Sequence, residues 1–79
     1  MNNITVYTKN NCVQCKMTKK ILLSMGLDFK EINISQYPEF VEGLKAEGFR
    51  QTPVVKIDGM EPFSGFRPDL LKKAAAQAA

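Results

Sequence analysis

The sequence has no histidine, no tryptophan and only two cysteines among its 79 residues. Without histidine, metal sites built on imidazole ligands and catalysis by a cysteine–histidine pair are excluded. No apolar run approaches the roughly 18 residues that a membrane-spanning helix needs. The amino-terminal MNNITVYT lacks the basic start and the apolar stretch of a signal peptide, so we expect a cytoplasmic protein that does not bind a membrane.

The chain is short and mildly basic. Its length suits one domain with a modest core, and no linker or internal repeat divides it, so we expect a single domain over residues 1–79. Eleven Lys and Arg against eight Asp and Glu give a net charge of +3. This excess is too weak for a nucleic-acid-binding domain, which also needs aromatic stacking platforms. The cluster Lys16, Lys19 and Lys20 is typical of a solvated helix face, with a docking surface for an acidic protein partner as the alternative.

Hydrophobic periodicity and the Gly and Pro positions predict seven elements. The expected strands are 3–8, 29–34, 53–57 and 60–64, and the expected helices are 13–25, 38–47 and a third that starts at Pro68 and frays in the Ala-rich end. We place Met17, Ile21, Leu22 and Met25 on the buried side of the first helix.

The order of these elements predicts an α/β domain, βαβαββα, with three helices flanking a small four-stranded mixed sheet. The first two strands and the helix between them form a βαβ unit, so these strands should be parallel. Asp58-Gly59 is a strong signal for a two-residue hairpin turn between the last two strands. Pro62 cannot donate to a sheet ladder, so the fourth strand should lie at an edge.

Cys12 and Cys15, in the stretch KNNCVQCK, are the candidate reactive groups. Two cysteines cannot complete a four-ligand zinc site within one chain. A permanent disulfide is unexpected in a reducing cytoplasm, and one that closes so small a loop stabilises little. Reversible thiol–disulfide exchange is therefore the favoured chemistry. Half of a metal or iron–sulfur site shared between two subunits is the alternative.

The two cysteines should differ in role because the predicted helix starts between them. Cys12 lies at the helix N-terminus, where free N–H groups and the helix dipole favour a thiolate, and Lys9 and Lys16 add positive charge. In Cys-x-x-Cys motifs the pKa of the first thiol commonly falls from about 8.5 to roughly 3.5–7.5. We expect an exposed Cys12 to attack a partner disulfide and a more buried Cys15 to resolve the mixed disulfide, with no further cofactor. The dipeptide between them, Val13-Gln14, should help to set the reduction potential.

Four stretches carry a resemblance to a known family: YTKNNC (7–12), CVQC (12–15), GFRQTPVV (48–55) and SGFRPD (64–69). In this order and spacing they resemble the glutaredoxin and thioredoxin superfamily, and within it the NrdH-redoxins. The resemblance implies a thioredoxin fold and reduction by thioredoxin reductase with NADPH. It also implies electron delivery to the C-terminal cysteine tail of a class Ib ribonucleotide reductase large subunit. We expect a monomer.

The resemblance also assigns roles to individual residues. Cys12 matches the nucleophile, Cys15 the resolving thiol, and Pro53 the cis-proline that leaves the Thr52 backbone free to pair with an extended partner segment. A plain strand-start proline at Pro53, and a plain surface charge at Arg67, are the alternatives. The residues expected to bind a partner are Lys9, Val13, Gln14, Thr52, Pro53, Phe66 and Arg67.

The chain departs from its relatives at two places. Phe63 stands where the family has a tryptophan, and Asn11 stands where thioredoxin itself has one. A glutathione-dependent glutaredoxin is the nearest rival, because Lys9 also matches the position that binds a glutathione carboxylate. Such proteins have a Gly-Gly segment followed by paired acidic residues, whereas this chain has SGFRPD. The positive charge of Arg67 is unfavourable beside the glutathione amine.

Overall fold

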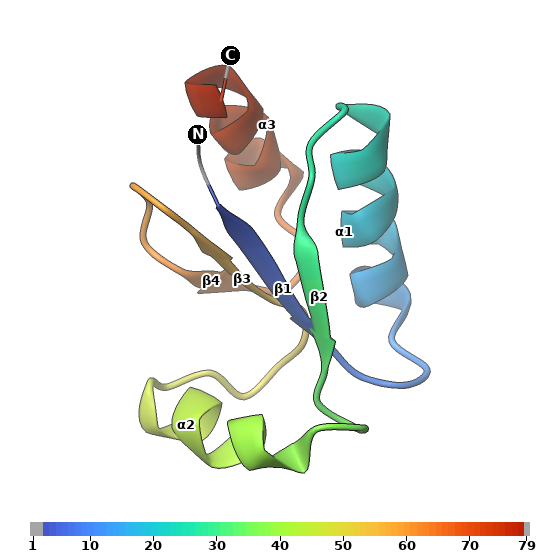
Figure 1. Ribbon diagram of the computed structural model, residues 1–79, viewed down its shortest axis with the longest axis vertical. Coiled ribbons are helices and arrows are strands. Elements are labelled where there is room, and N and C mark those ends of the chain that lie inside the picture. Colours follow the sequence, from blue (N-terminus) through green and yellow to red (C-terminus); the bar gives the residue numbers. More distant parts are fainter. Residues whose placement is uncertain (1–2, 79) are drawn as a thin grey trace.

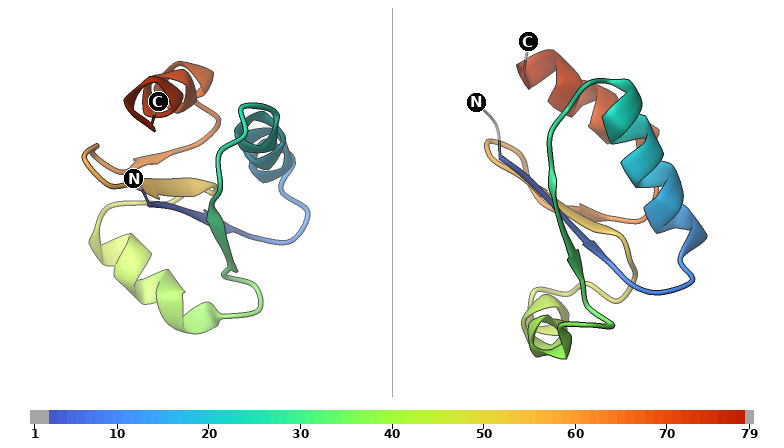
Figure 2. Two further views of the ribbon diagram at one scale, coloured as in Figure 1. Left: turned by 45° about the horizontal axis from the view of Figure 1, so that its top comes forward. Right: turned by 45° about the vertical axis from the view of Figure 1, so that its right-hand side comes forward.

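A computed structural model describes residues 3–78 of the chain and contains one sheet between two layers of helix (Figures 1 and 2). The strands occur in the order β2-β1-β3-β4, with β1 parallel to β2 and β3 antiparallel to both of its neighbours. Helices α1 and α3 cover one face, and α2 with the short 3₁₀ helix η1 covers the other. The elements are β1 Ile4–Thr8, α1 Val13–Ser24, β2 Lys30–Asn33, η1 Pro38–Phe40, α2 Val41–Ala46, β3 Val54–Ile57, β4 Phe63–Ser64 and α3 Pro68–Ala78.

The core lies between the sheet and the pair α1 and α3. Strand β1 is central, and its alternating pattern buries Ile4, Val6 and Thr8. Val6 pairs with Val55 on one side and with Glu31 on the other. The buried cluster comprises Ile4, Val6, Leu22, Val55, Ile57, Phe63, Leu71 and Ala74. The predicted order of elements, the parallel βαβ unit and the helices on both faces are therefore confirmed.

The fourth strand is shorter than the sequence predicted. The turn at Asp58-Gly59 is present, and the Met60 N–H donates to the Ile57 carbonyl at 3.1 Å. Pairing then resumes only at Phe63, opposite Val55, whereas a two-residue hairpin would place residue 62 there. Residue 62 is a proline without an N–H, so it cannot bond in the ladder. The predictions that residues 60–62 belong to the strand and that only two residues connect the last two strands are therefore wrong.

The buried stripe of α1 also differs from the prediction. Its fully covered side chains are Cys15, Thr18 and Leu22, whereas Met17 is exposed. Thr18 can occupy a core position because its hydroxyl donates to the Gln14 carbonyl at 2.8 Å, which satisfies the polar group locally. The face of α1 that packs on the sheet is therefore rotated by about one residue position from the face that hydrophobicity alone indicated.

Candidate active site

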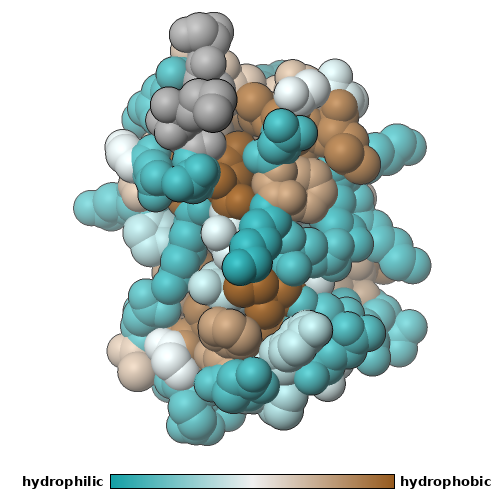
Figure 3. All heavy atoms as spheres, in the orientation of Figure 1, coloured by the Kyte–Doolittle hydropathy of each residue, from teal (hydrophilic) through white to brown (hydrophobic). Residues whose placement is uncertain are grey.

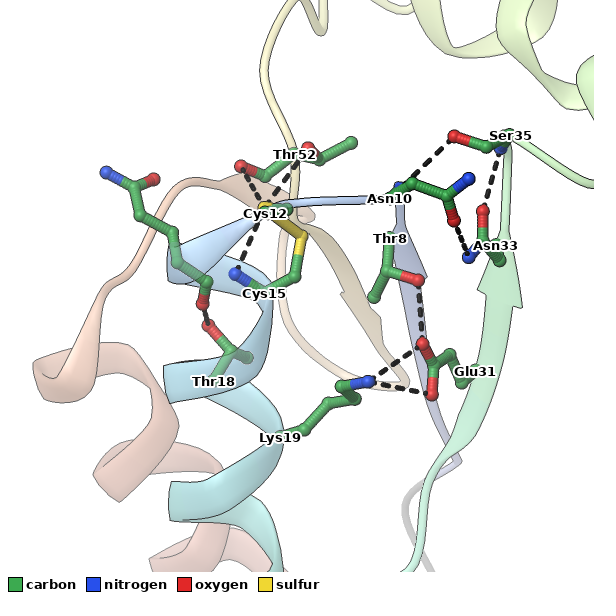
Figure 4. The surroundings of a disulfide bond; sticks show 11 residues. Thr8, Asn10, Cys12, Cys15, Thr18, Lys19, Glu31, Asn33, Ser35 and Thr52 are labelled. Carbon is green, nitrogen blue, oxygen red and sulfur yellow. Dashed lines mark hydrogen bonds and ion pairs between the residues drawn. A yellow bond between two sulfur atoms is a disulfide. The ribbon is translucent and has the colours of Figure 1, made fainter.

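The two cysteines lie at the junction between β1 and α1 (Figure 4). Cys12 is the residue that caps α1, with an extended backbone, and Cys15 lies in the first helical turn. A disulfide joins them across a Cα–Cα distance of 5.2 Å, within the usual range of about 4.4–6.8 Å. Asn11 leads into the cap with φ of 59°, a left-handed conformation that asparagine tolerates better than most residues.

Two donors point at the sulfur of Cys12. The Cys15 N–H lies 3.1 Å from this sulfur, and the Thr52 hydroxyl lies 3.5 Å from it. The Thr52 carbonyl oxygen is 3.7 Å away, a contact that becomes a hydrogen bond only when the sulfur carries a proton. The first turn of α1 has no acidic residue. After reduction, the same two donors and the helix dipole would favour the thiolate form of Cys12.

The exposure of the cysteines corrects part of the prediction. In the disulfide form Cys12 keeps only 8% of its surface accessible, so the expectation of an exposed nucleophile is wrong for this state. Cys15 keeps 2%, so the expected order of the two holds. Thr52 covers Cys12 from a segment forty residues away in sequence, which the local pattern could not show.

A shallow pocket gives access to Cys12. Lys9, Val13, Gln14 and Thr52 line it, so four of the residues predicted to bind a partner come together here. Arg50 and Gln51 line it as well, and sequence reasoning missed both. Their signal was present, because both belong to the stretch GFRQTPVV that carried the resemblance. The pocket therefore has two cationic side chains and no carboxylate.

The stretch 64–69 approaches the pocket only through Gly65. The Thr52–Pro53 peptide is cis, and the Pro53 carbonyl accepts a 2.8 Å hydrogen bond from the Gly65 N–H. A Cβ at Gly65 would lie 3.7 Å from the side-chain oxygen of Gln14. Phe66 packs against the core instead, and exposed Arg67 pairs with Asp69 at 3.3 Å. Neither residue lines the pocket at Cys12.

A polar network fastens α1 to β2 beside the disulfide (Figure 4). The Thr8 hydroxyl donates to Glu31 at 2.8 Å, and the Lys19 ammonium bonds both oxygens of the same carboxylate at 3.0 and 3.2 Å. Partial burial raises the pKa of Glu31, but the Thr8 hydrogen bond and the Lys19 charge outweigh it and lower the pKa below its ordinary value of 4.5. The network thus holds the first turns of α1 against the sheet.

We predict that this carboxylate contributes to stability in a defined pH range. Because the folded pKa is the lower one, its contribution is complete above pH 4.5 and is lost as the pH falls through the folded pKa. Glu31→Gln should therefore lower the free energy of unfolding at neutral pH by at most about 1 kcal/mol, since 30% of the Lys19 side chain and 36% of the Glu31 side chain are exposed and water screens the pair. The deficit should shrink as the pH falls below 4.5 and should vanish once Glu31 is protonated in the folded protein. Urea titrations across this range measure it, with exposed Glu61→Gln as control. A deficit that stays constant with pH contradicts the prediction.

Two further findings concern the described part of the chain. Among residues 3–78, no three His, Cys, Asp or Glu side chains gather where they could hold one metal ion. In the same range no helix has the length and apolar character to cross a membrane.

Comparisons with known proteins agree with this geometry. The glutaredoxin family model matches residues 4–61. Glutaredoxin-like protein NrdH of Escherichia coli (strain K12) is 51% identical over 70 residues, which cover 89% of this chain and 85% of that protein. Its namesake from Lactococcus lactis subsp. cremoris is 54% identical over 72 residues, covering 91% and 99%. The solved structure of the E. coli NrdH-redoxin, described for its thioredoxin-like activity profile, matches with a TM-score of 0.85 and 49% identity over 90% of this chain and 92% of that one.

Proposed function

Because this chain belongs to the glutaredoxin family, as an NrdH-like thiol–disulfide oxidoreductase, we propose that it carries electrons between two proteins in the cytoplasm. Thioredoxin reductase, with NADPH as the source, reduces the Cys12–Cys15 disulfide. The dithiol then reduces the C-terminal cysteine tail of a class Ib ribonucleotide reductase large subunit. The observation that carries this proposal is the placement of Cys12 at the start of α1 with two donors on its sulfur.

The exchange needs no other group. The reductase supplies two electrons and two protons, which convert the disulfide into two thiols. The Cys12 thiolate attacks one sulfur of the target disulfide and displaces the other as a thiolate. Cys15 then attacks Cys12 in the mixed disulfide, which restores the internal disulfide and releases a target with both cysteines reduced. We propose that the chain acts as a single-domain monomer whose disulfide is its only redox group.

The pocket at Cys12 suits an extended segment of the target. Within residues 3–78, neither the N–H nor the carbonyl of Thr52 pairs with another backbone group, so both can bond to an incoming chain. Val13 and Gln14 flank the sulfur, and Lys9 and Arg50 offer positive charge to carboxylates of the target. A tail that carries acidic residues next to its cysteines fits this arrangement. Pro53 lies behind the pocket, joined to Thr52 by the cis peptide bond, and its carbonyl is fixed by the Gly65 N–H. Phe66 and Arg67 lie outside the pocket, so we propose no direct contact between them and the tail.

A glutathione-dependent activity is the second candidate, because Lys9 and Arg50 could also bind the carboxylate of that tripeptide. A coupled assay with oxidised protein separates the two. NADPH with thioredoxin reductase should give fast reduction, whereas NADPH with glutathione reductase and glutathione should give slow reduction. Fast turnover with glutathione alone would overturn the proposal. Metal analysis beside a thiol titration tests the third possibility, a metal or iron–sulfur site shared by two chains, for which bound metal would replace two free thiols.

A further inference from the structure

The outward side of α1 carries an unusual set of side chains. We call this set the outer face: Val13, Lys16, Met17, Lys20 and Leu23. Val13 and Leu23 are 68% and 67% exposed and Met17 is 40% exposed, and they are three of the five large hydrophobic side chains that the described residues expose. Figure 3 shows hydrophobic and hydrophilic side chains next to one another over α1. Single exposed hydrophobic residues are ordinary, whereas three on one face of one helix make that face a candidate interaction surface.

The charge of the outer face has one sign. Helix α1 contains no Asp or Glu. The Lys19 ammonium pairs with Glu31, whereas the ammonium groups of Lys16 and Lys20 make neither a hydrogen bond nor an ion pair with any residue in 3–78. These two ammonium groups lie beside apolar side chains without a compensating carboxylate. A partner that supplies carboxylates together with apolar groups is complementary to this surface. A second copy of the chain is not, because two such faces would bring lysines together.

The outer face continues from the redox site. Val13 belongs to both, since it lines the pocket at Cys12 and begins the helix. Leu23 lies ten residues further along, about 15 Å away at the rise of an α-helix. An extended tail that pairs with Thr52 fills the pocket at Cys12 and reaches the outer face only at Val13. A folded protein whose reactive cysteines reach Cys12 would cover both.

We propose that the outer face of α1 docks the folded reductase, through a patch of carboxylates and apolar side chains beside that enzyme's reactive cysteines. The inference rests on the proposed function and adds that the two partners use different parts of the protein surface. The reductase uses α1, and the tail of the target uses the pocket at Thr52. Both engage Cys12, so they bind in turn and not together.

Three variants test this division in the NADPH-coupled thioredoxin reductase assay. Lys20→Glu should raise KM for the redoxin about three- to tenfold at low ionic strength with little change in kcat, and added salt should shrink the difference. Leu23→Gln should raise KM by a similar factor that salt does not alter. Lys72→Glu changes the charge by the same amount on α3, where Lys72 is also exposed, and should leave KM unchanged. Reduction of a short disulfide peptide by the dithiol forms should be equal in all variants.

The outcomes separate the two proposals. If the reductase reduces the wild type but Lys20→Glu and Lys72→Glu share one KM, the docking inference is wrong and the proposed function stands. If the reductase does not reduce the wild type, both are wrong. Slower reduction of the short peptide by Lys20→Glu would place the effect on the thiols and would overturn the docking inference as well. Circular dichroism of each variant confirms that the helix is intact.

Discussion

Replacing Cys12 with serine should abolish turnover with protein disulfides, whereas replacing Cys15 should stop the reaction at the mixed disulfide. Cys12 caps α1 and receives the Cys15 N–H and the Thr52 hydroxyl on its sulfur. A serine hydroxyl in that place stays protonated at neutral pH and has no neighbouring base, so the loss should be on the order of a thousandfold or more. Cys15 is buried behind it and has only the resolving step to perform. The coupled reductase assay measures the first loss.

Mass spectrometry of the reaction with an oxidised disulfide peptide distinguishes the roles. Cys15→Ser should accumulate a covalent adduct of protein and peptide through Cys12, which a dithiol reductant releases. Cys12→Ser should form no such adduct. Thr18→Ser, a conservative change on the same buried stripe, should turn over normally and serves as the control for disturbed packing. Accumulation of the adduct with Cys12→Ser, through Cys15, would reverse the assignment of nucleophile and resolving thiol.

The chemistry of the site could be predicted because it depends on local structure. A spacing of three residues at a helix start brings two sulfurs together, and the helical period ranks their burial without any knowledge of the rest of the fold. The thioredoxin fold was implied by the resemblance of four stretches to a known family, and the match to the E. coli NrdH-redoxin structure confirms it. The positions of β1, α1 and α3 follow from their own residues for the same reason.

The parts that could not be predicted depend on contacts between distant segments. Thr52 reduces the exposure of Cys12 across forty residues of sequence, and no local pattern reports that contact. The register of β4 depends on where the missing N–H of Pro62 falls opposite β3, which the turn signal alone does not fix. Arg50 belongs to the stretch GFRQTPVV that carried the resemblance, but its residue type alone did not distinguish it from other surface charges, and its place beside Cys12 comes from the fold.

Leu22→Ala should strongly destabilise the fold while leaving both cysteines in place. Leu22 is fully buried on α1, in the cluster that includes Val6 and Leu71, so its truncation leaves a cavity between helix and sheet. Such a change costs about 2–5 kcal/mol. A chain of this size has a total stability of roughly 4–12 kcal/mol, so the loss ranges from about a sixth of it to all of it. The midpoint of thermal unfolding should fall by about 10 °C or more.

The neighbouring residue provides a matched control for the loss at Leu22. Leu23 has the same side chain on the same helix but lies exposed on its outer face, so Leu23→Ala should change the free energy of unfolding by no more than about 0.5 kcal/mol. Urea titrations of both variants and the wild type, all in the oxidised form, measure the difference. Since Leu22 lies about two to three turns beyond the cysteines, the folded fraction of Leu22→Ala should still exchange disulfides at the wild-type rate in the cold. Equal losses at both positions would mean that α1 does not pack on the sheet through the stripe of Cys15, Thr18 and Leu22. The deeper burial of Cys15, on which the different roles of the two thiols depend, would then be contradicted as well.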